Sequence, residues 1–531
     1  MTSILPDPIV EGRSRVSEHG SAIDTSKAGW RLSLALCCVA AAIWAGFAPL
    51  ADPDLPMHLT VGEWIYRHHA VPTVEPFAWT RAGDPYFAYS WIAQWLFFST
   101  MKASGPAGLH ILTGLLGAAI VLAGAAAGRA FGLDEFRSTV FGALSIFIAM
   151  ESTPFLRPQL FMHVLMPLAW MLTFRVFDAR GSRQFGYAVL LWSVSAASAG
   201  VHITFLVVAA PVAVVLARAT RPTTRNVGIA ALAVALGWLT SPYALVWPRV
   251  LALNLTYNAT SAATGELIPG FAVAPLVGAA LALLPFLAGA RAQPVRERVM
   301  YAALWLAGLI VFARYFKGLG PWWWCASPLG ALALLRLPTP SEQRVRRAWS
   351  VLLPIVLLAF SPTNIRLWRA LHQYEQGPHG MLPSLKSFAA EPLVRWLSKE
   401  TELPQGTHVL TSFNYGSYVK WRLSGISESI DSRGIFPDSV ALPEVPTTSK
   451  TRALGPWSSS DLAILPESFP VTDVLDHDPA WRKMAVAAAV PWAPTAPRVA
   501  LWARRDWIAR HALGTLSEAV MELSIPSDVH R

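Results

Sequence analysis

Charged residues are scarce in this chain. Asp, Glu, Lys and Arg make up 14% of its 531 residues, whereas 53% are hydrophobic. A soluble domain carries about 25% charged residues, so the composition argues against an ordinary soluble protein. The deficit falls in long apolar runs, several near the ~20 residues that cross the hydrocarbon of a membrane. The lipid bilayer is therefore the expected surrounding.

Cysteine is also rare, and the three residues present lie in apolar runs at Cys37, Cys38 and Cys325. This excludes a disulfide framework and a cysteine metal motif. The formal net charge is +10, but the basic residues are spread among short loops. That distribution is typical of membrane topology signals and excludes a nucleic-acid partner.

A short basic signal-peptide start is missing as well. The residues up to Ser26 are polar and mixed in charge, which predicts a cytoplasmic tail over 1–30 and a retained first span near 32–50. The sequence predicts about eleven membrane spans in the module 31–362, with boundaries near 32–50, 107–127, 138–153, 160–175, 185–201, 203–217, 226–242, 271–290, 299–315, 320–337 and 348–361.

Arginine clusters alternate with arginine-poor loops in register with these spans, as the positive-inside rule requires. With a cytoplasmic N-terminus, the outer face receives the large first loop 51–106 and the C-terminal domain 363–531. Apolar residues at helical spacing around Trp64 and Trp91 predict amphipathic helices in that loop. Tryptophans 322–324 predict an interfacial aromatic belt.

The C-terminal domain reads as a soluble α/β or α+β domain. Strands are expected at 408–410 and 498–502, and helices at 392–399 and 479–484. The fold class is thus a polytopic α-helical membrane protein with a periplasmic C-terminal domain.

Ionisable residues collect at the predicted outer ends of different helices, and such groups usually mark sites. They are Asp52, Asp54, His58, Glu151, Arg157, His202, Glu266, Arg314 and Lys317. Each also has a structural interpretation. The two aspartates around Pro53 fit a turn, and His202 fits a tight helix-to-helix connection. The arginine side chains are also long enough to extend to the lipid headgroups.

Sugar transfer from a polyprenyl phosphate to a hydroxyl needs a carboxylate base, cations for the departing phosphate and a groove for the lipid. Asp52 or Asp54 is the candidate base, and Arg157, Arg314 and Lys317 are the candidate phosphate ligands. Asp52, Asp54 and His58 also form a candidate set for a divalent cation.

At these residues the chain resembles the GT-C superfamily of bacterial polytopic glycosyltransferases, which includes protein mannosyltransferase and aminoarabinose transferase types. The resemblance runs through Asp52-Pro-Asp54-Leu55, His58-Leu59, Gly62-Glu63-Trp64-Ile65, Val71-Pro72, Glu75-Pro76-Phe77, Trp79-Thr80, Ser90-Trp91-Ile92-Ala93-Gln94, Arg157-Pro158-Gln159-Leu160-Phe161, Ser241-Pro242-Tyr243, Gly265-Glu266-Leu267, Asn414-Tyr415-Gly416-Ser417-Tyr418, Trp421-Arg422-Leu423 and Asp431-Ser432-Arg433-Gly434. A turn often written Asn-Leu-His-Gly in the family departs from that pattern here and reads Ser198-Ala199-Gly200-Val201-His202, which keeps the histidine and loses the glycine.

The resemblance implies an inverting transferase of a bacterial inner membrane that uses a polyprenyl-phosphate-linked sugar and a glycan, lipid or protein acceptor. It implies a catalytic carboxylate at Asp54 or Asp52, with Asp54 favoured. The implied substrate-binding residues are His58, Glu75, Arg157, His202, Glu266, Arg314 and Lys317. A transporter of lipid-linked glycans and a non-catalytic scaffold of envelope assembly are the alternative functions.

Overall fold

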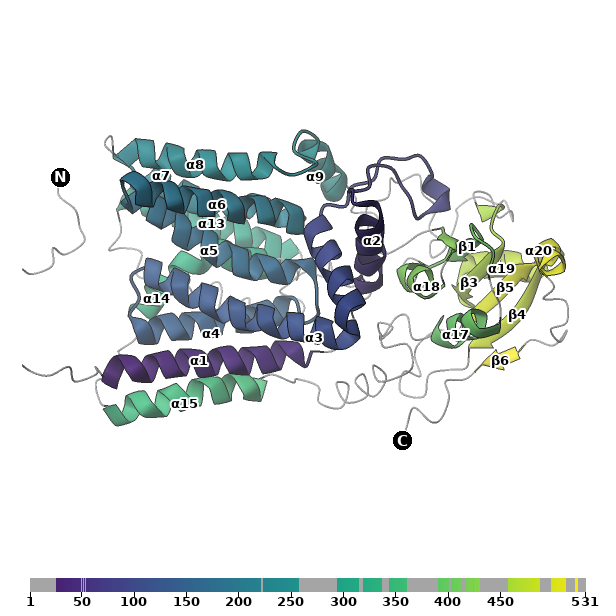
Figure 1. Ribbon diagram of the computed structural model, residues 1–531, viewed down its shortest axis with the longest axis horizontal. Helices are drawn as coiled ribbons and strands as arrows, with labels where there is room; N and C mark the ends of the chain where they lie inside the picture. The colour runs from purple at the N-terminus through teal and green to yellow at the C-terminus, as the bar shows by residue number, and fades with distance from the viewer. Residues whose placement is uncertain are drawn as a thin grey trace, which may run out of the picture.

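The protein consists of a long helical bundle and a smaller α/β domain at one end of it (Figure 1). The computed structural model describes residues 25–48, 50, 52, 54–220, 223–256, 294–314, 319–336, 343–360, 390–400, 403–412, 416–423, 425–429, 457–487, 498–511 and 521–523.

The bundle is made of helices that pack side by side around two buried apolar clusters. Their bounds are α1 Thr25–Gly46, α2 Leu55–His68, η1 Trp79–Arg81, α3 Trp91–Ala130, α4 Glu135–Ser152, α5 Pro158–Asp178, α6 Gly181–Val201, η2 Ile203–Ala209, α7 Ala210–Arg218, α8 Thr224–Leu239, α9 Trp247–Thr256, α13 Val295–Arg314, α14 Leu319–Leu334 and α15 Gln343–Phe360.

Helices occupy the predicted spans, apart from 271–290, which lies outside the described residues. Local signals set several ends. The Asp134 carboxylate caps α4 by accepting from the Arg137 amide, and α5 begins at Pro158, where the missing amide hydrogen does no harm. Within α3, Gly105 adopts a positive φ of 60° just before Pro106. This kink separates the part of α3 in the first loop from the span expected at 107–127.

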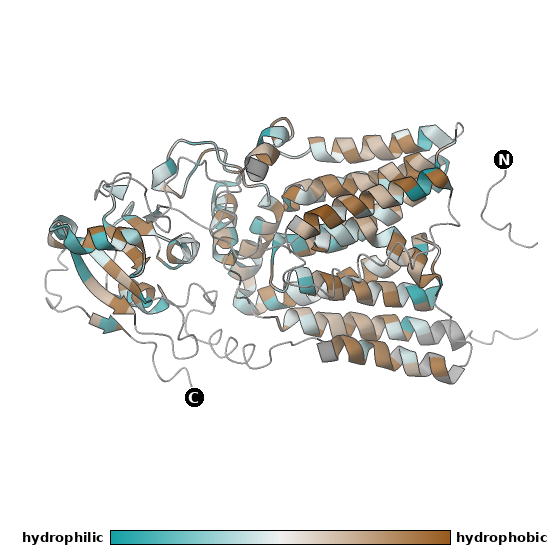
Figure 2. Cartoon of the chain, turned by 180° about the vertical axis from the view of Figure 1, so that it is seen from behind, coloured by the Kyte–Doolittle hydropathy of each residue, from teal (hydrophilic) through white to brown (hydrophobic). Residues whose placement is uncertain are grey.

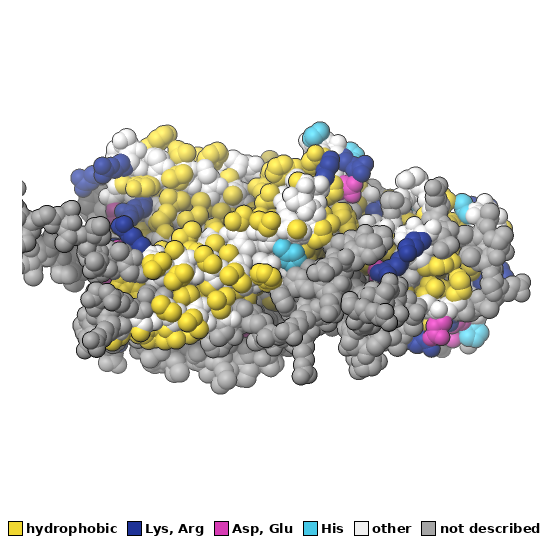
Figure 3. All heavy atoms as spheres, turned by 60° about the horizontal axis from the view of Figure 1, so that its bottom comes forward, with side chains coloured by type: hydrophobic (Ala, Val, Ile, Leu, Met, Phe, Trp, Pro, Cys, Tyr) yellow, Lys and Arg dark blue, Asp and Glu magenta, His cyan; other side chains and the backbone are white. Residues whose placement is uncertain are grey.

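Large apolar side chains cover the outside of the bundle, which Figure 2 shows as brown helices and Figure 3 as a yellow surface. Leu32, Ile111, Leu115, Phe185 and Leu232 are all more than half exposed. By length and composition, two described helices, α3 and α5, are able to cross a membrane. Shorter apolar helices lie at Trp30–Gly46, Ile203–Arg218 and Thr224–Leu239.

The prediction of an aromatic belt at tryptophans 322–324 is wrong. All three side chains are buried in the larger apolar cluster of the bundle. The indole of Trp324 donates to Nδ1 of His163 on α5, and Gly320 lets the start of α14 approach the same imidazole. A run of tryptophans fits a tightly packed helix interface as well as a membrane surface, and periodicity alone does not separate the two.

The C-terminal domain is a mixed sheet with helices on both faces. Its elements are α17 Glu391–Glu400, β1 His408–Thr411, α18 Gly416–Arg422, β2 Ser427–Glu428, β3 Leu462–Pro466, α19 Pro470–His477, β4 Trp481–Ala487, β5 Val499–Arg504, α20 Arg505–Arg510 and β6 Met521–Leu523. The strand order is β2-β1-β3-β5-β4-β6; the pairs β2-β1, β1-β3 and β4-β6 are parallel, and the pairs with β5 are antiparallel.

Helices α17, α18 and α20 pack on one face of this sheet, and α19 packs on the other. The expected strands at 408–410 and 498–502 and the expected helix at 392–399 are confirmed. The helix expected at 479–484 is wrong, because β4 begins at Trp481. Along β4, Trp481 and Val486 lie on the α19 side of the sheet and the consecutive residues Met484 and Ala485 lie on the opposite side, because the register shifts between Lys483 and Ala485. This irregularity interrupts the alternation of side chains, so the sequence shows no clear strand repeat at 479–484.

Candidate functional site

The site begins where α1 gives way to α2. Asp52 is fully buried, and its Oδ2 accepts a hydrogen bond from Nε of Arg157, the residue before α5. Oδ1 of Asp52 accepts from the Asp54 amide at 2.7 Å. The carbonyl of Asp52 also accepts from the Leu55 amide at 3.2 Å. Asp52 therefore fixes both the turn into α2 and the guanidinium of Arg157.

Asp54 is the more accessible of the two aspartates. Its side chain is 23% exposed, compared with 0% for Asp52, and its Oδ2 lies 3.4 Å from Nη2 of Arg157. Asp54 is the N-cap residue of α2, yet its carboxylate accepts no capping hydrogen bond from the described first turn. Arg157 contacts both carboxylates, and the solvent-facing member of the cluster is Asp54.

His58 lies one turn further along α2 and is buried against α3. Nε2 of the Gln94 side-chain amide lies 3.3 Å from Nδ1 of His58. The ring packs edge-on against Phe97. The close crossing of α2 and α3 requires a glycine at Gly62, because a Cβ there would lie 2.1 Å from the Gln94 carbonyl oxygen.

A small pocket of about 30 Å³ opens beside His58. The first loop supplies most of its lining, which consists of Met57, His58, Arg81, Pro85, Tyr86, Phe87, Tyr89 and Gln94. A volume of this size holds one or two waters but no sugar ring. Arg81 brings a positive charge to it, held by Asp84 at 3.0 Å. Arg81, the last residue of η1, and Tyr86, in irregular backbone, escaped the sequence analysis, whereas Gln94 belongs to a motif noted there.

His202 lies near the rim of this pocket, edge-on to Tyr89. Its ring caps η2 by accepting from the Thr204 amide at 3.3 Å, and Nδ1 contacts the Thr204 hydroxyl at 2.8 Å. These contacts give His202 a structural role in addition to its place at the site.

Glu75 is buried, and its Oε1 accepts from the amides of Phe77 and Ala78. It holds the turn that precedes η1. Tyr243 anchors the other side of the loop by accepting from the Ala88 amide and donating to the Pro72 carbonyl. Burial raises the pKa of the Tyr243 hydroxyl, which keeps it protonated and able to donate.

The structure thus brings together Asp52, Asp54, His58 and Arg157, with His202 and Glu75 in the surrounding shell of the first loop. Glu266, Lys317 and the side chain of Arg314 lie outside the described residues, although Arg314 itself ends α13. Among the described residues, no group of three His, Cys, Asp or Glu side chains is placed to hold a metal ion. Arg157 faces the two carboxylates, so it is not a cation reserved for phosphate.

The C-terminal domain contacts the first loop next to this site. Ala78 forms a parallel bridge with Glu428, the Ser427 hydroxyl donates to the Phe77 carbonyl, and the Thr80 hydroxyl donates to the Ser429 carbonyl. Helix α18 also packs on α2, and its Trp421 meets Phe98 of α3 edge-on.

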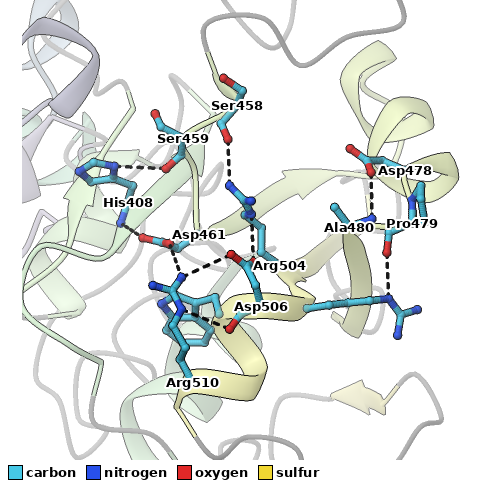
Figure 4. A network of polar contacts seen from close by, with 12 residues as sticks. His408, Ser458, Ser459, Asp461, Asp478, Pro479, Ala480, Arg504, Asp506 and Arg510 are labelled. Carbon is cyan, nitrogen blue, oxygen red and sulfur yellow. Dashed lines mark hydrogen bonds and ion pairs between the residues drawn. The ribbon is translucent and has the colours of Figure 1, made fainter.

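The indole of Trp79 stacks on His408 with ring centroids 4.9 Å apart. A polar network on the domain holds His408 in place (Figure 4). The His408 amide donates to Asp461, and Nδ1 of His408 donates to the Ser459 carbonyl. The domain therefore presents a fixed aromatic surface to the first loop.

No protein-family model matches this chain, and no curated protein is significantly similar to it.

Proposed function

We propose that this protein is a membrane-embedded inverting glycosyltransferase of the GT-C type. It moves a sugar from a polyprenyl-phosphate donor to a glycan, lipid or protein acceptor at the periplasmic face of a bacterial inner membrane. The exposed apolar surface of the bundle supports the membrane setting, because soluble proteins rarely expose contiguous apolar patches of that extent.

The observation that carries the proposal is that two aspartates contact one arginine but differ in their exposure to solvent. Asp52 is buried and holds Arg157, whereas Asp54 reaches solvent and lies 3.4 Å from the same guanidinium. A base that accepts a proton must be reachable by the acceptor and held in one orientation. Asp54 meets both requirements, and Asp52 meets only the second.

In this reaction the Asp54 carboxylate takes the proton from the acceptor hydroxyl as its oxygen attacks the anomeric carbon. The bond from that carbon to the phosphate oxygen breaks, and the polyprenyl phosphate leaves with the electron pair. A single displacement of this kind inverts the anomeric configuration. General-base assistance contributes roughly 10²–10⁴-fold to such a step.

The departing phosphate needs a positive charge. Arg81, which lines the pocket and pairs with the half-exposed Asp84, is the described candidate, alongside the earlier candidates Arg314 and Lys317. Since the pocket is too small for a sugar ring, donor binding requires the first loop around η1 to move outward.

The test uses the purified full-length protein in lipid nanodiscs, with radiolabelled polyprenyl-phosphate sugars and a crude envelope extract as acceptor. We expect label to move to the extract, and Asp54→Asn to slow this transfer by ~10²-fold or more while melting at the wild-type temperature. Glu63→Gln, an exposed carboxylate change on the same helix, serves as the matched control.

Transfer at the wild-type rate by Asp54→Asn, or no transfer from any donor by the wild-type protein, would rule out the proposal. Lipid movement across vesicles without sugar transfer would instead favour a transporter. A defect of the cell envelope that appears only when the C-terminal domain is removed would instead favour a scaffold.

A further inference from the structure

A second site lies at the end of the bundle opposite Asp54, between the beginnings of α6 and α8. A cavity of about 600 Å³ opens there. Two arginines stand at its mouth, Arg180 just before α6 and Arg225 in the first turn of α8, and both are exposed. This cavity is far larger than the pocket beside His58, and nothing in the proposed transfer reaction uses it.

Helices α6 and α8 pack closely at their ends away from this cavity. There the Ser195 hydroxyl donates to the Val234 carbonyl, and a Cβ on Gly237 would lie 2.5 Å from the Ser195 side chain.

Two residues that line the cavity, Gln184 and Asn226, are bonded to the end of α5. The Gln184 amide donates to the Val176 carbonyl, and the Asn226 amide donates to the Phe177 carbonyl at 2.7 Å. These bonds fix the two helix beginnings relative to each other. The cavity is therefore part of the rigid packing of three helices.

An apolar strip continues from the arginines along both helices. Phe185, Ala188 and Ile229 line the cavity itself. Beyond them, Val189 and Leu190 on α6 and Leu232 and Leu236 on α8 are exposed at helical spacing. Figure 3 shows the same arrangement for the bundle as a whole, with dark-blue basic side chains at its far end and a yellow apolar surface beside them.

We infer that this groove binds an anionic phospholipid. The phosphate lies between the guanidiniums of Arg180 and Arg225, and the acyl chains lie along the apolar strip of α6 and α8. Arginine is suited to this role because its planar group binds two phosphate oxygens at once. Basic pockets between helices on the cytoplasmic side are a recurrent place for acidic headgroups. The inference rests on the membrane setting proposed above and not on sugar transfer.

The test measures lipid retention by the purified full-length protein with native mass spectrometry, using phosphatidylglycerol and phosphatidylcholine as probes. We expect the wild type to retain phosphatidylglycerol in preference to phosphatidylcholine. Arg180→Gln/Arg225→Gln should weaken that retention on the order of tenfold or more. Arg183→Gln, an exposed arginine of α6 that does not line the cavity, is the matched control.

Wild-type retention by the double variant, or equal loss in the control, would overturn the inference. Displacement of the lipid by inorganic phosphate or glycerol phosphate alone would overturn it too, because the site would then recognise a free anion. A melting curve of each variant without added lipid shows that the fold is intact. Because the assay detects no transfer, its failure leaves the glycosyltransferase proposal standing, and the reverse also holds.

Discussion

Arg157 and Asp52 form a buried ion pair between residues 105 positions apart in the sequence. The pair joins the start of α5 to the turn that leads into α2. It fixes the position of the neighbouring Asp54 carboxylate, since Arg157 also reaches that side chain. The geometry around the candidate base thus depends on one long-range contact.

Removing one partner of this pair should destabilise the protein strongly. Arg157→Gln or Asp52→Asn removes one charge of this buried pair, which costs roughly 3–5 kcal/mol. The double variant should lose less than the sum of the two single losses. Thermal unfolding of all three variants in detergent measures the coupling, and strictly additive losses would contradict it.

Replacing Gly62 by alanine should disturb the site through packing alone. The added methyl group would collide with the Gln94 backbone, so α2 must move away from α3 and carry His58 with it. The expected loss is about 1–3 kcal/mol or more. Gly228→Ala on α8 is the control, where a Cβ meets open space and the change should stabilise the helix by roughly 0.5–1 kcal/mol. Melting temperatures that shift in the same direction for both variants would count against this account.

The C-terminal domain should become less stable at alkaline pH because of Tyr418. Burial raises the pKa of this hydroxyl well above its ordinary value, and the Glu391 carboxylate that accepts its hydrogen bond raises it further. The unfolded chain ionises near pH 10, whereas the folded domain keeps the proton. The contribution of this group is therefore complete below pH 10 and declines above it by up to about 1.4 kcal/mol per pH unit.

Tyr418→Phe removes this group and should flatten the dependence. The comparison is the unfolding temperature of wild type and variant between pH 8 and pH 11. Parallel curves for the two proteins would show that other groups cause the alkaline loss.

Weakening the contact between the first loop and the C-terminal domain should make local opening more frequent in both segments. Trp79→Ala removes the stack on His408, and Thr80→Val removes the hydrogen bond to the Ser429 carbonyl. Hydrogen exchange of residues 77–80 and 427–429 should accelerate by about tenfold in the double variant, as expected for a loss near 1.4 kcal/mol. Trp95→Ala, which removes an exposed indole of α3, is the control. Unchanged exchange would mean that the backbone bridge alone holds the two parts together.

The helical ranges could be predicted from the sequence, because a long uninterrupted apolar run seldom forms a structure other than a helix. The grouping of Asp52, Asp54, His58 and Arg157 was also predictable, since alternating arginine clusters assign these residues to one end of the bundle. The structure does place the side chains of Asp52, Asp54 and Arg157 together, and His58 follows one turn later on α2. Membrane crossing itself stays a prediction.

The finer features of the site depend on tertiary contacts that no local pattern encodes. Asp52 and Asp54 are two residues apart and look alike in sequence, and only the position of Arg157 separates the buried one from the exposed one. Arg81 lines the pocket from the end of η1, a helix of three residues that is too short for a repeat to indicate which way its side chains point. The prediction of short strands such as β4 fails for a related reason, because sheet partners elsewhere in the chain decide their conformation.

The bridge between Ala78 and Glu428 has a practical consequence for dissecting this molecule. In the described part of the chain, β2 ends the sheet, and the first loop takes the position of the next strand. A fragment containing only the C-terminal domain would carry an uncovered sheet edge, and such edges recruit other chains. Self-association of that fragment would then reflect the missing loop and say nothing about the oligomeric state of the intact protein.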